Sequence, residues 1–537
     1  MKSDEKKILH ISLVEILFLL SFGIMIFAKG IGLVEGTILF KAALLASAFC
    51  IFIKILIDKY SLIEYAYIIS FILLGIIIWR VSSNQAPLLF IFILVGMKNV
   101  SLERVFKLGA LIWTTTFVFQ IVTHILDLRY QDFVIHHKFG MGYMIRWALG
   151  YTHPNVLQIS YGVLVAYLLY SFELKGKKKY MMLIFSFLGS IYIFLYSLSA
   201  TGLILYVSLV FFYLIATYKY ECRKKINKLE KILINLVLPF SVFIAVIIPV
   251  VLQGETFDKV NQLFETRLSL TKTFVSNYGI NLFGHNFSDL YYGLTLDSSY
   301  PYLLMYGGLI VFVIVIVLYL FLIKDSVKQY NESLDYRDAV EISILLSFVI
   351  AAISEPFFFN TSYKNVTWLF LGSYVWKKIK KDVLEFQIIK KEMQFDIPIH
   401  KLLKVKKQFC NSYIKNIKAI ISISIILAFI SSIFVFKTFN IPKTVYALRS
   451  SCQTTEDSES IYISEENALS LNNDSDVWFL NYKDEETPML KFDGSIAYID
   501  RYRMSISMFI WGYAFINIIL AIGFFYKNSK DCKGYNL

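Results

Sequence analysis

The chain has 537 residues, of which 57 % are hydrophobic and only 17 % are charged. Because soluble domains carry about 25 % charged residues, this composition excludes an ordinary soluble domain. The formal net charge of +13 is gathered in short loops between apolar runs, which argues against a nucleic-acid partner and fits the positive-inside rule. Anionic membrane lipids are therefore the expected partners of this charge.

Apolar runs of about 20 residues follow one another along the chain, each long enough to cross the hydrocarbon core of a bilayer. Their continuity predicts helices, because the strands of a membrane barrel would alternate between apolar and polar residues. We therefore expect an all-α polytopic membrane protein with about 14 transmembrane helices and both termini in the cytoplasm. The expected spans are residues 9–28, 34–57, 62–79, 86–97, 109–126, 153–172, 181–198, 202–218, 232–252, 301–322, 340–358, 363–377, 417–436 and 505–526.

A basic connector divides these spans into two groups. Residues 1–376 form a polytopic body of twelve spans, with the main external loop at 253–300. Residues 377–416 form the basic cytoplasmic connector, and residues 417–537 form a two-helix hairpin with an external insert at 437–504. We find no internal repeat.

Two of these regions carry local patterns of their own. In the connector, "VLEFQIIKKEM" predicts an amphipathic helix along the membrane face. In the insert, "SIYIS", "DVWFL" and "SIAYI" predict three short strands. The cysteines show no metal-ligand spacing, and only Cys452 is expected outside, so we expect no internal disulfide, metal or cofactor.

The first external cluster of polar residues ends in "RWALGYTHPN". Thr152 and Pro154 predict a helix start, with Thr152 as the N-cap. Such a start directs free N–H groups and a positive dipole end outward, which suits an anion. Arg146, His153 and Asn155 would complete an anion site there, although an arginine at this depth can also be an interfacial anchor.

The second cluster lies in the main external loop and leads into the next span. Arg267 begins an amphipathic stretch, and His285, Asp297 and Ser298 follow it. An exposed loop tolerates any of these residues singly. Together a cation, a titratable base and a carboxylate near one membrane face suffice for acid–base chemistry on a phosphate-linked substrate.

Two further polar features lie close to the same face. "SATG", Ser199–Gly202, joins two spans too closely for a real loop, so it either lines a cavity or forms a buried tight turn. Glu355 lies near the outer end of a span, where a carboxylate is costly unless it is paired. Arg146 or Arg267 is its expected partner.

With these residues assembled, the chain resembles the bacterial O-antigen and capsular polysaccharide polymerases of the Wzy type, within the O-antigen ligase and polymerase superfamily. The resemblance rests on four motifs in order and covers Met1 to about Trp376. The motifs are "RWALGYTHPN", "SATG", "TRLSLTKTFVSNYGINLFGHN" and "LDSSYPYLLMYGGLIVF".

The resemblance implies an inverting glycosyltransferase at the outer face of the bacterial cytoplasmic membrane. Such an enzyme polymerises oligosaccharide repeat units linked to undecaprenyl pyrophosphate into capsular polysaccharide or exopolysaccharide, and the resemblance implies no cofactor. It also implies a chain-length regulator and a flippase of the same pathway as protein partners. The residues implied to bind substrate and pyrophosphate are Arg146, Asn155, Thr201, Arg267 and Ser298.

The same resemblance implies four catalytic candidates. His153 or His285 would orient or deprotonate the acceptor hydroxyl. Asp297 and Glu355 would position the basic groups or serve as the alternative base.

Three other functions stay open at this point. A flippase or exporter of lipid-linked sugars suits about 14 spans, but it is expected to place its charges along a central cavity between two bundles. A ligase that moves finished glycan to another acceptor shares the same site logic. The third is a non-catalytic scaffold for polysaccharide assembly.

Overall fold

The structure, a computed structural model, describes residues 8–126, 128, 132–138, 140, 142–287, 296–358, 360, 362–379, 385–389, 393–398, 400–453, 460–472 and 476–534. Within these residues, ten helical segments are long and apolar enough to cross a membrane. The expectation of a helical, multi-pass membrane protein is therefore confirmed. The ten segments are α1 (Leu13–Gly30), α2 (Ile38–Ile57), α3 (Leu62–Ser82), α5 (Leu102–Ile125), α7 (Lys177–Ser197), α8 (Ala200–Glu221), α9 (Lys228–Val242) with η1 (Phe243–Ile247) and α10 (Ile248–Val251), α13 (Ser299–Tyr302) with η2 (Leu303–Gly307) and α14 (Gly308–Ser333), α17 (His400–Thr438), and α19 (Tyr498–Gly534) with the turn before it.

The other four expected spans coincide with shorter or less apolar helices. These are α4 (Ala86–Gly96), α6 (Pro154–Ser171), α15 (Tyr336–Ala351) and α16 (Thr367–Lys378). Most residues of α6 and α15 are buried by neighbouring helices, including Gln158, Ser160, Ser343 and Ser347. A helix without a lipid-facing side can carry such polar residues, which lowers its hydropathy. The exact number of spans, and the side on which each terminus lies, stay predictions.

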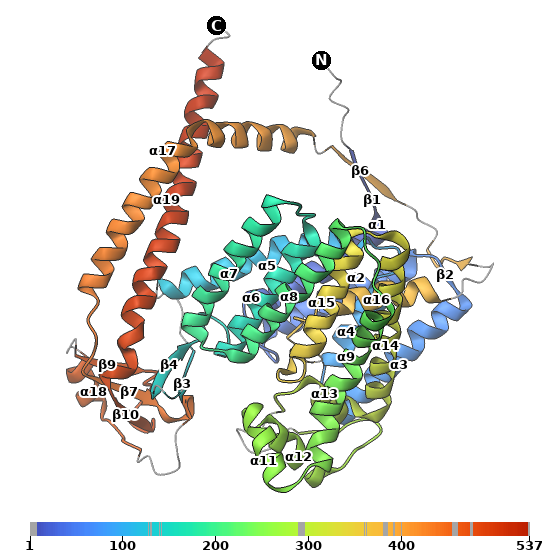
Figure 1. Cartoon of the computed structure of the whole chain (residues 1–537), viewed down its shortest axis with the longest axis horizontal. Helices are drawn as coiled ribbons and strands as arrows, with labels where there is room; N and C mark the ends of the chain where they lie inside the picture. Colours follow the sequence, from blue (N-terminus) through green and yellow to red (C-terminus); the bar gives the residue numbers. More distant parts are fainter. Residues whose placement is uncertain are drawn as a thin grey trace.

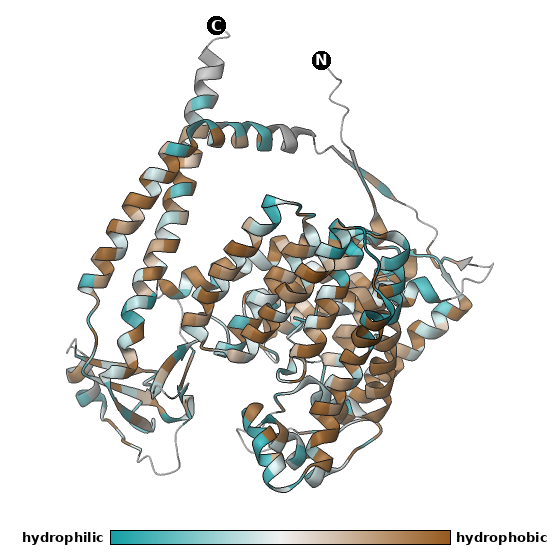
Figure 2. Cartoon of the chain, viewed as in Figure 1, coloured by the Kyte–Doolittle hydropathy of each residue, from teal (hydrophilic) through white to brown (hydrophobic). Residues whose placement is uncertain are grey.

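The helices form a body and, beside it, a hairpin whose α19 is hydrogen-bonded to α7 (Figure 1). In the body, α6, α8 and α15 pack against one another and their buried residues join one large apolar core. Helices α17 and α19 pack along each other and stand beside the body. Apolar residues dominate the helices of both parts, whereas hydrophilic residues gather at α11 (Gly254–Leu263), α12 (Arg267–Tyr278) and the loops (Figure 2). The end of the molecule with α11 and α12 is called the loop end below.

Two small antiparallel pairs form at the opposite end, and the one that contains β5 corrects the prediction of an amphipathic helix at 383–393 in the connector. Strand β6 (Gln394–Pro398) pairs with β1 (Ile8–Ser12), and β5 (Glu385–Phe386) pairs with β2 (Tyr60–Ser61). Residues 387–389 and 393 of the predicted helix are not helical either, and residues 383–384 and 390–392 lie outside the described residues. A short apolar run does not determine its own conformation, and here the partner strands lie more than 300 residues away.

At the loop end, the first external loop and the C-terminal insert form one β structure. Strand β3 (Phe133–His137) pairs with β4 (Tyr143–Trp147) and also with β8 (Cys452–Gln453). A second sheet has the order β10 (Met489–Asp493), β7 (Thr444–Leu448) and β9 (Val477–Leu480). The two sheets share an apolar core of Phe133, Ile135, Ile145, Val445, Ala447, Ile496 and Ala497. The hairpin is therefore attached to the body through the strands that precede "GYTHPN".

Of the three strands predicted in the insert, "DVWFL" is right, because β9 lies within it. "SIYIS" contributes only an isolated bridge between Ile461 and Met489. "SIAYI" is wrong, because Gly494–Ala497 forms a 3-10 turn (η5) that continues into α19. The insert also contains a short helix, α18 (Glu465–Asn472).

Candidate functional site

Five polar side chains from distant parts of the chain meet at the loop end, and we call them the Glu355 network. Arg146, Thr201, Arg267 and Glu355 are buried, and Asn155 is half-buried. Arg146 belongs to β4, and Glu355 lies between α15 and η3 (Pro356–Phe358). The other three lie in the first turns of α6, α8 and α12. All five are among the residues predicted to form the site.

Glu355 is the centre of this network. Its Oε1 accepts a hydrogen bond from Asn155 Nδ2 at 3.1 Å and another from the hydroxyl of Thr201. The same oxygen lies 3.6 Å from Arg267 Nη2. Burial raises the pKa of Glu355 to about 7, although Arg267 and Thr201 favour the ionised form. The carboxyl group therefore changes its charge near neutral pH.

Arg146 is joined to Glu355 through Asn155. Its Nη2 donates to Asn155 Oδ1 at 2.6 Å, and its Nε donates to the carbonyl oxygen of Ser197 at 2.8 Å. The Asn155 amide thus faces the cation with its oxygen and the carboxylate with its nitrogen. The side chain of Arg146 is 4 % exposed, and burial lowers its pKa to about 10, so it stays cationic at neutral pH.

Arg267 is one of the two arginines predicted to pair with Glu355, and its guanidinium group has a donor without a hydrogen-bond partner among the described residues. Its Nη1 lies 3.4 Å from Glu265 Oε2 and 3.4 Å from the carbonyl oxygen of Phe264. Its Nε is buried and has no hydrogen-bond partner among the described residues. A buried donor without a partner is costly, and an anionic ligand would satisfy it.

The local backbone directs Arg267 into the network. Glu265 and Thr266 both adopt left-handed conformations, with φ of 49° and 67°, before α12 begins at Arg267. Such conformations are unfavourable for non-glycine residues and persist only where tertiary contacts impose them. Lys138 supplies one such contact, because its Nζ lies 2.7 Å from Glu265 Oε1. Lys138 and Glu265 were not predicted as site residues, although the charge alternation in "FETR" is a weak sequence signal for the second.

The helix start in "GYTHPN" is correct, but its cap is not Thr152. His153 is the N-cap of α6, and its Nδ1 accepts the backbone N–H of Asn155 at 3.1 Å. Burial and the charges of Arg146, Arg267 and Lys138 lower the pKa of His153 to about 4. At neutral pH the ring is therefore neutral and carries its proton on Nε2. In this geometry Nδ1 is occupied as an acceptor, and Nε2 is the ring nitrogen that can donate.

The "SATG" segment is a buried turn that belongs to the site. Ser199 caps α8 by accepting the backbone N–H of Gly202 at 3.2 Å. Gly202 packs against Gln158 so closely that an added Cβ would lie 2.6 Å from that side chain. This packing holds the first turn of α8 beside α6, so the Thr201 hydroxyl reaches Glu355.

The "LDSSYP" motif reaches the network through a residue next to the predicted one. Ser298 donates to the carbonyl oxygen of Ala352 at 3.4 Å and does not contact the Glu355 side chain. Ser299 instead donates through its hydroxyl to the backbone carbonyl of Glu355. Asp297 is half-buried, and its charge is one of the causes that raise the pKa of Glu355.

His285 lies apart from the network within the described part of the chain. Its Nε2 lies 3.2 Å from the carbonyl oxygen of Gly279, and its ring packs near Tyr278 and Phe287. Its backbone N–H donates to the carbonyl of Met305 at 2.8 Å. These contacts brace the loop between α12 and α13 and do not bring the imidazole to Glu355.

Helix α19 supports the strand that carries Arg146. Arg503 is 1 % exposed and donates to the carbonyl oxygens of Ile145, at 2.9 Å, and Leu195, at 2.6 Å. Asp500 accepts from Arg503 at 2.7 Å and from the indole of Trp147 at 2.8 Å. Both neighbours of Arg146 in β4 are therefore bonded to the C-terminal hairpin.

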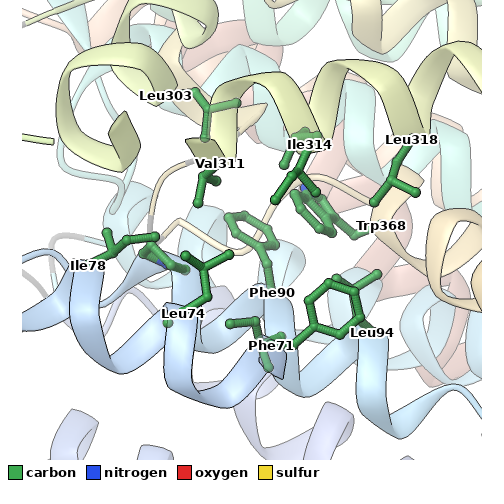
Figure 3. Close-up of a pocket in the computed structure, with 14 residues that line it drawn as sticks. Phe71, Leu74, Ile78, Phe90, Leu94, Leu303, Val311, Ile314, Leu318 and Trp368 are labelled. Atoms are coloured by element: carbon green, nitrogen blue, oxygen red, sulfur yellow. The ribbon is translucent and has the colours of Figure 1, made fainter. Parts of the chain in front are cut away.

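An apolar groove lies between α3, α4, α14 and α16 (Figure 3). Its free volume, the open side included, is about 570 Å³, and all of its lining residues are apolar. Leu303, at its α14 side, comes four residues after Ser299 in the sequence. The groove suits a hydrocarbon chain and not a charged or sugar group.

The arrangement contains the groups that anion binding and proton transfer require. Three helix N-termini and two guanidinium groups converge on one carboxylate, which produces a positive environment for an anion. The carboxylate has a pKa near neutrality, as a general base requires. Among the described residues, no group of three or more His, Cys, Asp or Glu side chains is placed to hold a metal ion.

Comparison of the chain with protein-family models, with curated proteins and with solved structures finds no match.

Proposed function

We propose that this protein polymerises oligosaccharide repeat units carried on undecaprenyl pyrophosphate, at the outer face of the bacterial cytoplasmic membrane. The observation that carries the proposal is the buried Glu355 network, in which two arginines surround one titratable carboxyl group. Its members come from motifs that resemble those of Wzy-type polymerases and from the Glu355 segment. An inverting glycosyltransferase with a lipid-pyrophosphate donor needs this combination of a base and cations.

In the proposed reaction, the hydroxyl oxygen of the acceptor sugar attacks the anomeric carbon of the donor glycan. The proton of that hydroxyl passes to Glu355, and the bond between the anomeric carbon and the pyrophosphate oxygen breaks. Arg146 and Arg267 stabilise the negative charge that develops on the leaving pyrophosphate. His153 orients the acceptor hydroxyl through a hydrogen bond from Nε2. Asn155 and Thr201 orient the Glu355 carboxylate.

The distribution of charge supports chemistry at one face over transport through the body. Helices α1, α2, α3, α5, α7 and α8 carry their charged side chains only near their ends, and α6 carries none. A flippase needs a polar path for the glycan across the hydrocarbon core. The charged groups of these helices offer no such path between the two ends.

The basic loops support an external position for the loop end. The clusters at 175–179, 223–231 and 377–378 lie in or beside the turns at the opposite end of the body. Short loops rich in Lys and Arg favour the cytoplasmic side, which supports an external position for the Glu355 network. The apolar groove of Figure 3 then provides a surface for an isoprenoid chain, and Leu303 at its edge follows Ser299 by four residues.

The test uses the full chain in proteoliposomes with a purified lipid-linked repeat unit. Wild-type protein is expected to produce a ladder of polymer lengths, and Glu355→Gln and Arg267→Ala are expected to leave single units. The matched control is Glu255→Gln, which alters an exposed carboxylate at the same end. An unchanged ladder in Glu355→Gln would contradict the proposal. Transfer of repeat units across the bilayer without a ladder would indicate a flippase, and a single transfer to a different acceptor would indicate a ligase.

A further inference from the structure

A buried lysine near the Glu355 network has no carboxylate partner among the described residues. Lys364 precedes α16 and is 6 % exposed. Its Nζ lies 5.7 Å from the centre of the Tyr151 ring, and no hydrogen bond or ion pair joins it to the described part of the chain. An ammonium group on so buried a side chain is unfavourable without a partner, and its Nζ is accessible to a ligand.

A second ammonium group, that of Lys29, acts on Lys364 through its charge. Lys29 is in the last turn of α1, where its Nζ lies 3.6 Å from Glu35 Oε1 and 4.1 Å from the centre of the Phe40 ring. Burial and the charge of Lys29 lower the pKa of Lys364 to about 7, and the charge of Glu355 opposes this shift. The two lysines therefore form a cationic pair. Among the described residues, its charge is offset by Glu35, which pairs with Lys29, and by Glu355.

The backbone holds Lys364 in this position. Tyr363 has a φ of 58°, a left-handed conformation that is unfavourable for an aromatic residue. Its side chain is buried and packs against Phe22, with the ring centres 6.0 Å apart. Strained residues of this kind persist only where the surrounding structure imposes them, and they cluster at functional sites.

We propose that Lys364 and Lys29 bind an anionic group of the acceptor substrate, separately from the donor pyrophosphate at Arg146 and Arg267. This inference rests on the proposed function, because polymerisation requires two lipid-linked substrates at once. One arginine pair cannot hold an anion from each substrate without strong repulsion between the two. The anion is a sugar carboxylate or phosphate near the reacting hydroxyl, or the pyrophosphate of the acceptor lipid.

Binding of small probes to the full chain in phosphatidylcholine nanodiscs tests this second site. The probes are geranyl pyrophosphate, which carries the lipid anion, and methyl glucuronide, which carries a sugar carboxylate, with methyl glucoside as the neutral comparison. Wild-type protein is expected to bind geranyl pyrophosphate at an Arg267-dependent site and one of the two anionic probes at a second site. Lys364→Met is expected to weaken the second site at least tenfold and to leave the first unchanged. The control Lys259→Met, at an exposed lysine of the loop end, is expected to change neither.

The outcomes separate failure of this inference from failure of the proposed function. If Lys364→Met binds both anionic probes with wild-type affinity, the proposed acceptor site is wrong. The same conclusion follows if phosphatidylglycerol displaces the probe at the second site as effectively as the unlabelled probe does. If geranyl pyrophosphate does not bind in an Arg267-dependent way, the proposed function itself is wrong. Thermal unfolding checks that Lys364→Met is folded. Because this variant removes an unpartnered charge, its melting temperature is expected to rise. A lower melting temperature in Lys364→Met would show a structural partner for the ammonium group and would also overturn the inference.

Discussion

The raised pKa of Glu355 predicts a pH dependence that an ordinary carboxyl group would not show. The base must be ionised to accept a proton, so activity rises with pH through the pKa. With a pKa of about 7, Glu355 is about one-tenth ionised at pH 6 and about nine-tenths ionised at pH 8. The kcat/KM for polymerisation is therefore expected to fall about tenfold from pH 8 to pH 6. A carboxyl group at its usual pKa of 4.5 would stay ionised over this range.

Thr201→Val tests whether this pH dependence belongs to Glu355. The Thr201 hydroxyl donates to the carboxylate, and a hydrogen bond to a charged group contributes about 1.5–3 kcal/mol. Its loss is expected to move the pH midpoint upward by about one to two units. Ser298→Ala is the matched control, because that hydroxyl bonds to Ala352 and not to the Glu355 side chain.

The assay measures initial rates of repeat-unit consumption in proteoliposomes from pH 5.5 to 9. Lys364 titrates in the same range, so the series is repeated in Lys364→Met, where the midpoint set by Glu355 is expected to persist. The folded protein also binds more protons at Glu355 than the unfolded chain does between pH 4.5 and about 7. The contribution of Glu355 to stability therefore decreases as pH rises through that window. A flat rate between pH 6 and 8, or an unmoved midpoint in Thr201→Val, would refute the assignment of Glu355 as the base.

Three further substitutions test the surroundings of Glu355. His153→Asn keeps an N-cap that accepts the Asn155 amide but removes the Nε2 donor, so kcat is expected to fall with little change in melting temperature. His153→Ala also removes the cap and is expected to lose about 1 kcal/mol of stability. Equal kcat in wild type and His153→Asn would exclude the donor role. Arg146→Lys replaces a guanidinium group that donates to two acceptors with a single ammonium group. The kcat/KM is expected to fall about 10-fold to 100-fold while the fold is retained. Wild-type kinetics would show that the guanidinium group is dispensable. Trp147→Phe removes one hydrogen bond to buried Asp500. This change is expected to destabilise the protein by about 1 kcal/mol and to lower kcat through the neighbouring Arg146. Loss of stability with unchanged kcat in the folded fraction would show that the hairpin does not affect the site.

The sequence by itself determined the class of the protein and the positions of its helices. Hydropathy is a local property, because a span of about 20 residues must satisfy its own backbone hydrogen bonds in lipid. For the same reason, all fourteen predicted spans coincide with helices, although α6 is less apolar than the ten segments and α15, with 16 residues, is shorter than they are. The cost of a buried charge likewise pointed to Glu355 and to an arginine as its partner.

Only the tertiary structure decided which polar groups meet. Asn155 bridges Arg146 to Glu355 across 200 residues of sequence, and Ser299 rather than Ser298 reaches the Glu355 segment. The cap of α6 is His153, and this choice sets which ring nitrogen carries the proton. No local sequence pattern predicts these hydrogen bonds, because their partners are set by how helices and strands from distant parts of the chain pack together. The same reason explains why the connector pairs as strands, and why α19, outside the recognised motifs, supports the strand that carries Arg146.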